Sequence, residues 1–450
     1  MSGVVGSSIG TNDHRPWARD DWWAGTRAGL TGATGLSPAA YADEHFFADE
    51  QAAVFARAWV CVGLADEVRG PGRLLVRDVG ERSVLITRSN DGELYGFLNS
   101  CRHRGTELAA ADCEIANTIR CPYHRWGYAT DGRLVAAPHF EDLPRDSFDK
   151  ADHGLVRVRV DTWGALLFAC LHEGTAPLLD WLSDLPDRMA GYGLDAWTER
   201  TSEQVDIAAN WKLVSENFQE YYHLTWVHPE LSKVSRVDDH YRYQGRGMYC
   251  GQSTTPVSGN DRDDWLRMPP ADDLDDSDMH SGRFVAIFPN VLLSVLPNHA
   301  FVMRLAPRSA GVTVETCSWL LPPRSTGLGD DDFAPTREFW LEVNGEDIDI
   351  VERGQRGLAR GSVPAGPLAP RFEEPLHRFH NMLADSMTLA SPCEIRIPEG
   401  DDPASEADRR GTRANPAPAA IDDLVARVTV AGRTGRGQSR NVKSASSAKR

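Results

Sequence analysis

Residues 101–124 read CRHRGTELAAADCEIANTIRCPYH, and this stretch holds two short pairs of metal-binding residues. Cys101 and His103 are separated by one residue, and Cys121 and His124 by two. A structural zinc site also takes two Cys and two His, but zinc fingers pair Cys with Cys and His with His. Because each pair here mixes the two residue types, each loop can supply one ligand to each ion of a two-metal centre. The spacing therefore favours a dinuclear centre over zinc.

A second informative stretch is residues 210–231, NWKLVSENFQEYYHLTWVHPEL. The sequence predicts a helix over 211–224, which would place Glu220 and His223 on one helix face because they are three residues apart. His228 stands directly before a proline, where a helix usually ends. Two histidines near a helix end can bind one metal ion if a third ligand arrives from elsewhere in the chain.

The third ligand is sought in a long helix expected over 335–357, which carries a run of carboxylates. Two histidines and one carboxylate occupy one face of Fe(II) and leave positions open for O2 and substrate. A thiolate ligand would be oxidised there, and a fourth protein ligand would block a position. The sequence thus predicts a mononuclear iron site whose carboxylate is one of Glu346, Asp347, Asp349 and Glu352.

Composition restricts the class of protein and its partners. The chain has 450 residues and a formal net charge of -17, which argues against nucleic acid or an anionic membrane as a partner. We find no apolar run long enough to span a membrane and no secretory signal at the start, so we expect a cytoplasmic protein. The eight cysteines form no dense disulfide framework, and the cytosol would keep them reduced.

The pattern of apolar residues divides the chain into four parts. Residues 1–45 form an N-terminal segment expected to be partly disordered. Residues 46–172 begin with a helix and continue as short apolar runs broken by Gly and Asp, which is typical of a small all-β domain. Residues 173–392 mix helices with alternating strands, and residues 393–450 have the composition of a flexible tail. The expected fold class is α+β.

Together these motifs resemble the large (α) subunit of the Rieske non-haem iron oxygenases, over roughly residues 40–390. The resemblance implies a Rieske iron–sulfur domain followed by a helix-grip catalytic domain, in which an antiparallel sheet wraps around a long helix. It also implies that Cys101 and Cys121 hold one iron of a [2Fe–2S] cluster, and that His103 and His124 hold the other.

The resemblance gives roles to the residues of the second site as well. It identifies His223, His228 and Asp347 as the iron ligands and leaves Asp349 as the alternative carboxylate. It gives Glu220 a catalytic role, as a bridge between His223 and His124 of the partner subunit. Such a bridge implies a homotrimer in which electrons cross from one subunit to the next.

Several short stretches resemble the branch of the family that acts on glycine betaine, choline, carnitine or stachydrine. They are residues 99–105, 121–126, 288–291 and 355–358. This resemblance implies a monooxygenase that oxidises an N-methyl group of a quaternary or methylated amine and releases formaldehyde. NADH would supply electrons through a separate flavin and iron–sulfur reductase, and O2 would be the co-substrate. The alternatives are the α subunit of an aromatic-ring-hydroxylating dioxygenase and an iron–sulfur electron carrier without oxygenase activity.

A trimethylammonium group binds best against aromatic faces in a dry pocket. Ordinary core packing is the simpler interpretation of any single aromatic residue in this region. The candidates for the substrate pocket are Tyr221, Tyr222, Trp226, Phe288 and Phe301.

Overall fold

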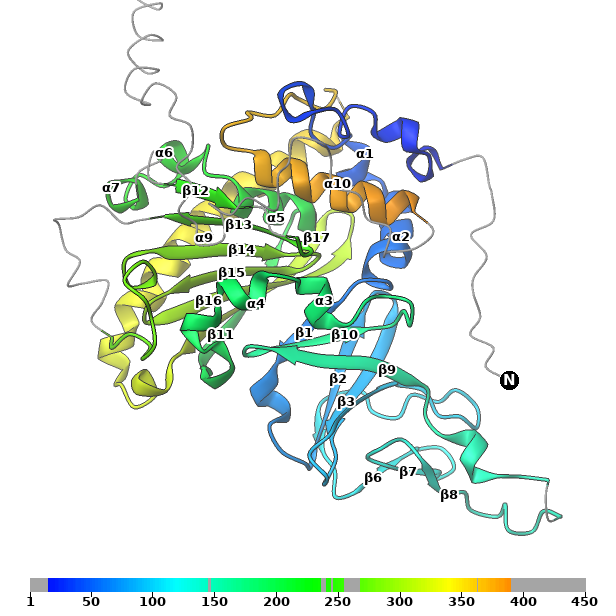
Figure 1. The fold of residues 1–450 in the computed structure, drawn as a ribbon. Helices are drawn as coiled ribbons and strands as arrows, with labels where there is room; N and C mark the ends of the chain where they lie inside the picture. Colours follow the sequence, from blue (N-terminus) through cyan, green and yellow to red (C-terminus); the bar gives the residue numbers. More distant parts are fainter. Residues whose placement is uncertain are drawn as a thin grey trace, which may run out of the picture.

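The computed structural model describes residues 15–389 apart from 145–146, 236–239, 244–245, 255–267 and 362. It contains two seven-stranded sheets and one three-stranded sheet, and all their strand pairs are antiparallel. Helices pack mainly against the second sheet (Figure 1), so the predicted α+β fold class is confirmed. The predicted flexible tail, 393–450, lies outside the described residues, as do the first 14 residues.

The first large sheet and the three-stranded sheet form the lower part of Figure 1. Cys101 and His103 lie in the loop after one strand of the large sheet, and Cys121 and His124 lie in a tight loop of the small one. The large sheet has the order β1 (Val60–Leu64), β10 (Leu166–Cys170), β9 (Arg157–Trp163), β4 (Leu94–Leu98), β3 (Arg82–Arg88), β2 (Arg73–Val79) and β5 (Cys113–Glu114). The small sheet has the order β6 (Thr118–Arg120), β7 (Gly127–Ala129) and β8 (Leu134–Ala136).

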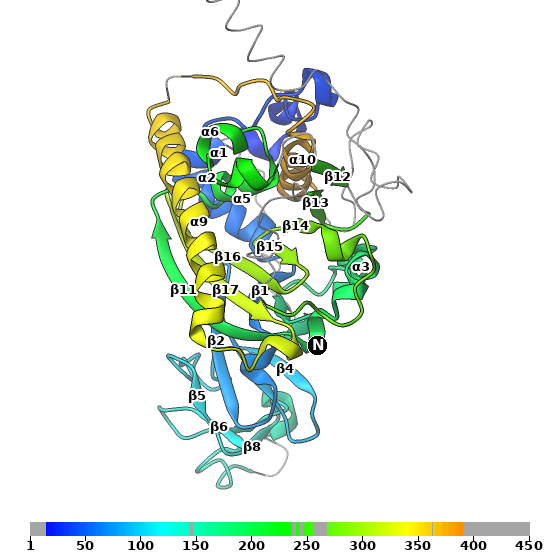
Figure 2. The ribbon, with the colours of Figure 1, turned by 90° about the vertical axis from the view of Figure 1, so that its left-hand side faces the viewer.

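The second large sheet forms the upper half of the molecule, and the long helix α9 (Asp330–Ala359) runs along it (Figure 2). Its strands are mostly buried, which is expected for a sheet covered by helices. The strand order is β11 (Thr198–Ile207), β17 (Val312–Leu321), β16 (His299–Ser309), β15 (Val291–Leu296), β14 (Gly282–Ile287), β13 (Tyr249–Thr254) and β12 (His240–Tyr243). The other α-helices in the described residues are α1 (Ala39–Ala42), α2 (Glu44–Glu50), α3 (Leu178–Leu182), α4 (Leu185–Arg188), α5 (Trp211–Gln219), α6 (Leu224–Val227), α7 (Leu231–Val234) and α10 (Glu374–Thr388).

The predicted helix over 211–224 is wrong near its end, because α5 ends at Gln219 and a separate short helix, α6, begins at Leu224. Glu220 adopts an extended backbone conformation, with φ -123° and ψ 159°. Its carboxylate accepts hydrogen bonds from the backbone N–H groups of Tyr222 and His223, which replaces the helical hydrogen bonds there. Glu220 and His223 therefore approach each other across a turn and not along a helix face.

The described portion of the N-terminal segment packs against the rest of the molecule. Within the described residues 15–45, Trp17 and Trp23 are buried. Helix α2 lies at the start of the predicted domain 46–172. It nevertheless contacts α5, which belongs to the predicted domain 173–392. There, Lys212 Nζ lies 2.7 Å from Glu50 Oε1, and neither side chain is exposed to solvent. Trp211 Nε1 donates to the other Glu50 oxygen at 2.8 Å, so the buried carboxylate is held from both sides.

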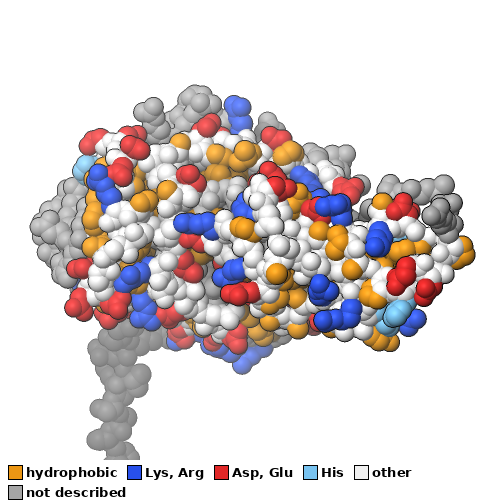
Figure 3. All heavy atoms as spheres, turned by 90° about the horizontal axis from the view of Figure 1, so that it is seen from below, with side chains coloured by type: hydrophobic (Ala, Val, Ile, Leu, Met, Phe, Trp, Pro, Cys, Tyr) orange, Lys and Arg blue, Asp and Glu red, His pale blue; other side chains and the backbone are white. Residues whose placement is uncertain are grey.

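No helix in the described ranges is long and apolar enough to cross a membrane. Figure 3 views the molecule from below, and on the described part of this face basic and acidic side chains are interspersed. The negative net charge is therefore not gathered into one patch on this side.

Candidate metal centres and the adjoining cavity

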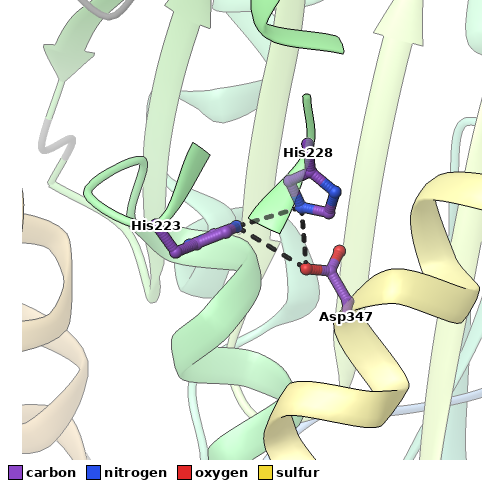
Figure 4. Close-up of side chains that lie close together, drawn as sticks. All are labelled: His223, His228 and Asp347. Atoms are coloured by element: carbon purple, nitrogen blue, oxygen red, sulfur yellow. Dashed lines mark hydrogen bonds and ion pairs between the residues drawn. The ribbon is translucent and has the colours of Figure 1, made fainter. Parts of the chain in front are cut away.

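His223, His228 and Asp347 converge on one point (Figure 4). His223 precedes the short helix α6, His228 follows it, and Asp347 projects from α9. The Nε2 atoms of the two histidines are 3.2 Å apart. Asp347 Oδ1 lies 2.9 Å from Nε2 of His228 and 3.6 Å from Nε2 of His223. One ligand atom from each residue thus lies within 4.8 Å of the others, which is close enough for all three to bind one ion.

Two further carboxylates fix the orientation of the imidazoles. Glu220 Oε1 is hydrogen-bonded to Nδ1 of His223, and Glu346 Oε2 lies 2.7 Å from Nδ1 of His228. A carboxylate at Nδ1 makes that nitrogen the donor, so the lone pair of each ring is on Nε2. Both lone pairs then face each other and Asp347. An arrangement of three electron-rich atoms needs a cation, and the chemistry of the donor set fits Fe(II).

The protonation behaviour of the two histidines agrees with this arrangement. Burial disfavours the charged form of His223, but the hydrogen bond and charge of Glu220, with the charge of Asp347, outweigh burial and raise its pKa. Burial likewise acts against His228, and Asp347 and Glu346 together raise its pKa. The site therefore attracts positive charge.

The four carboxylates that the sequence left as candidates for the third ligand differ in their surroundings. Asp347 also accepts a hydrogen bond from Asn217 Nδ2 at 2.7 Å, which orients its oxygen toward the histidines. Asp349 is exposed and pairs with Arg353 at 2.7 Å. Glu352 accepts from a backbone N–H at 3.0 Å, and Glu346 contacts Nδ1 of His228, the nitrogen that faces away from Asp347. The geometry favours Asp347 as the third ligand.

The two cluster loops lie next to each other and bring their predicted ligands close together. Cys101 and Cys121 are buried, and the rings of His103 and His124 are 4.8 Å apart. Nδ1 of His103 is buried and has no hydrogen-bond partner among the described residues, so it is free to bind a metal ion. The arrangement fits a [2Fe–2S] cluster with two thiolate and two imidazole ligands.

Residues around the cluster loops hold these ligands in place. The indole of Trp126 stacks on the His103 ring at 4.9 Å. The hydroxyl of Tyr128 lies 3.2 Å from the sulfur of Cys101, where it can tune the cluster by hydrogen bonding. A positive φ of 71° at Gly105 lets the loop turn back directly after the first pair of ligands.

A cavity of about 110 Å³ adjoins the His223, His228 and Asp347 site, several times the volume that one water needs. Tyr221 and Phe301 line it, as the sequence predicted. The prediction is wrong for Tyr222 and Trp226. After α5 ends at Gln219, these two side chains face solvent and are 54% and 68% exposed. The prediction is also wrong for Phe288, which packs in the core against Phe379.

Sequence reasoning missed several residues that line the cavity. They come from β14 of the second sheet, from α5 and from α9, where the available signals were a period of two along the strand and a spacing of three to four along the helices. The missed aromatic residues are Phe218, Phe284, Phe339 and Trp340.

Comparison with known families finds one family model in the part with the cluster loops and another in the part with the candidate iron site. The Rieske [2Fe-2S] domain matches residues 58–149, and the catalytic domain of the ring hydroxylating alpha subunit matches residues 194–389. The chain belongs to the Rieske non-haem iron oxygenases. As a member of this family it is an enzyme with a [2Fe–2S] cluster and a mononuclear iron, which uses O2 and electrons from a reductase.

Two curated relatives are glycine betaine monooxygenase oxygenase subunits. The one from Pseudomonas aeruginosa (strain PAO1) is 28% identical over 379 residues, which cover 77% of this chain and 87% of the relative. The one from Chromohalobacter salexigens is 29% identical over 77% of this chain and 84% of the relative. Among solved structures, the quaternary ammonium Rieske monooxygenase CntA with its substrate L-carnitine has a TM-score of 0.67 at 23% identity, over 82% of this oxygenase and 99% of CntA.

Proposed function

We propose that this oxygenase oxidises an N-methyl group of a quaternary or methylated amine, so that the carbon leaves as formaldehyde. The balance is one O2, two electrons and two protons per methyl group. One oxygen atom leaves in formaldehyde and the other in water, and the amine nitrogen keeps a proton in place of the methyl group. The observation that carries the proposal is the cavity beside His223, His228 and Asp347, whose aromatic walls and nearby carboxylates suit a methylated cation.

Different residues of the site have different proposed roles. His223, His228 and Asp347 would hold the iron, which supplies O2 activation when bound. Glu220 and Glu346 keep Nε2 of each imidazole directed at that point. Aromatic side chains would surround the methyl group in a mainly apolar cavity, where a cation is attracted to ring faces.

The positions of the two sites support electron delivery from one subunit to another. The small sheet, whose loop carries Cys121 and His124, lies at one end of the molecule in Figures 1 and 2. Helix α6 and the adjacent part of α9 lie at the other end. We therefore propose a homotrimer in which Glu220 connects His223 with the partner's His124. The exposed rings of Tyr222 and Trp226, next to this position, would form part of the contact between subunits. A cytoplasmic flavin and iron–sulfur reductase would supply electrons from NADH.

Sedimentation velocity on the metal-loaded protein tests the assembly. A trimer is expected, and Trp226→Glu should dissociate it, because a buried charge in an apolar contact is costly. Asp349→Asn, on the exposed side of α9, is the matched control and should leave the mass unchanged. A monomeric wild-type protein with full coupled turnover would exclude transfer between subunits.

Turnover with a surrogate reductase tests the reaction itself. With NADH and O2, we expect formaldehyde from trimethylammonium compounds and no diol from naphthalene. The dioxygenase alternative is worth testing because the large component of a Pseudomonas putida naphthalene 1,2-dioxygenase system is 32% identical over 42% of this chain. Formation of diol without formaldehyde would replace our proposal with that alternative. An iron content of about two per chain, and not about three, would favour the electron carrier.

A further inference from the structure

One row of side chains crosses the second sheet on the face that lines the cavity. Gln252 of β13 is paired with Phe284 of β14, Phe284 with Ser294 of β15, and Ser294 with Phe301 of β16. Directly opposed residues in antiparallel strands point to the same face. All four side chains line the cavity, so two aromatic rings alternate with two polar groups along one wall.

Gln252 and Ser294 each have one buried polar atom without a hydrogen-bond partner in the described part of the chain. Gln252 Nε2 donates to the backbone oxygen of Phe218 at 3.3 Å, which fixes the amide and leaves Oε1 buried without a partner. The hydroxyl of Ser294 is also buried and unpartnered, and this residue is 0% exposed. A buried polar atom without a partner is destabilising, so its presence is explained if a ligand supplies the partner.

The charges around the cavity limit what that ligand can be. Among the described lining residues, the carboxylates are Glu220 and Asp347, and none is Lys or Arg. Apart from the iron that His223, His228 and Asp347 would hold, an anionic group would therefore find no positive lining side chain to offset its charge. It would also meet Gln252 Oε1, which can only accept hydrogen bonds. A hydroxyl or amide group suits both atoms, because it can donate to Gln252 Oε1 and accept from the Ser294 hydroxyl.

We propose that Gln252 and Ser294 are specificity-determining residues that select a methylated amine carrying a neutral hydroxyl or amide group in place of a carboxylate. The inference rests on the proposed function and narrows its substrate class. Phe284 and Phe301, the rings of the same row, would hold the apolar part of such a substrate between its neutral polar group and its methylated nitrogen.

Binding to the iron-loaded holoenzyme, measured by isothermal titration, tests this. The probes are three matched series with alkyl chains of increasing length: trimethylammonium alcohols, which begin with choline, trimethylammonium carboxylates, which begin with glycine betaine, and alkyltrimethylammonium ions without a polar end. We expect the best alcohol to bind roughly three- to tenfold more tightly than the alkyl analogue of equal length, as one or two neutral hydrogen bonds provide. Ser294→Ala and Gln252→Met should each remove most of that advantage and leave the alkyl series unchanged.

Ser318→Ala is the matched control, because Ser318 lies in the same sheet, donates to Glu199 at 2.8 Å and does not line the cavity. Carboxylates that bind more tightly than every alcohol would overturn the inference and leave the proposed N-demethylation intact. The same holds if both variants retain the alcohol preference. Binding of naphthalene with no binding of any trimethylammonium probe would overturn the proposed function itself.

Discussion

Glu346 is the residue whose replacement best tests how the iron site is held. It is adjacent to Asp347 on α9, and the two side chains reach opposite nitrogens of His228. Glu346 Oε2 lies 2.7 Å from Nδ1, and Asp347 Oδ1 lies 2.9 Å from Nε2. Glu346→Ala removes the acceptor from Nδ1 and allows the ring of His228 to rotate or change tautomer.

The size of the effect follows from the burial of the two partners. Loss of a carboxylate behind a metal-binding histidine weakens metal binding by roughly 10- to 100-fold, or about 1.4–2.8 kcal/mol. His228 is only 2% exposed, whereas the Glu346 side chain is 31% exposed. Water can therefore reach the space left by Glu346 and partly satisfy Nδ1, so we expect a loss of about tenfold. Glu346→Gln keeps an acceptor oxygen and should lose less.

Competition with a chelator measures the affinity for Fe(II), and the absorbance of the [2Fe–2S] cluster serves as an internal control because the cluster lies in the other domain. Asp349→Ala is the matched variant, since Asp349 lies on the same helix but is exposed and pairs with Arg353. The reasoning is refuted if Glu346→Ala binds iron as tightly as the wild type. It is refuted equally if Asp349→Ala weakens binding as much as Glu346→Ala does.

Three further predictions concern other parts of the same domain. Glu220→Gln should keep the full iron content but slow formaldehyde release strongly in the coupled assay, and near-normal coupled turnover would remove the bridge from the mechanism. Lys212→Met leaves Glu50 buried without its counter-charge, so the free energy of unfolding in urea should fall by about 3–5 kcal/mol. The double variant with Glu50→Leu should regain part of this loss, and strictly additive losses would contradict the coupling. Burial lowers the pKa of His299 to about 3, whereas the pKa in the unfolded chain is about 6.5. Between these pH values the unfolded state binds a proton that the folded state does not, so stability should rise with pH, by at most about 5 kcal/mol. His299→Gln should flatten this dependence, and an unchanged slope of the urea midpoint against pH would contradict the assignment.

The candidate cluster ligands and the two histidines of the candidate iron site could be picked out because their spacing is local, whereas the carboxylate comes from a distant helix. The sequence did not by itself separate Asp347 from Asp349, yet it contains a signal that does. The buried residues of α9 include Trp340, Asn344 and Val351. Positions four and seven residues apart fall on one helix face, so position 347 lies on the buried stripe and position 349 faces away from it. The buried stripe of the helix therefore favours Asp347 as the ligand. The run of carboxylates alone did not distinguish it from Asp349.

The substrate pocket was harder to predict because it depends on where α5 stops. A helix that continued to residue 224 would have given Tyr222 and Trp226 a different orientation. Instead the carboxylate of Glu220 competes with the helix for the backbone N–H groups of two following residues. The local pattern of apolar residues does not predict this competition, because it depends on hydrogen bonds from a polar side chain to nearby backbone N–H groups.

The same break in α5 explains why Glu220 is suited to its proposed role. Its Oε2 atom accepts from two backbone N–H groups, and its Oε1 atom is hydrogen-bonded to Nδ1 of His223. Each contact restricts the carboxylate, so its position relative to the histidine is fixed before any partner subunit binds. A glutamate on a continuous helix would lack the two backbone contacts and would have more rotamers available. We infer that the early end of the helix orients Glu220 for electron transfer, and that it also leaves the surface beside His223 open for the partner's cluster domain.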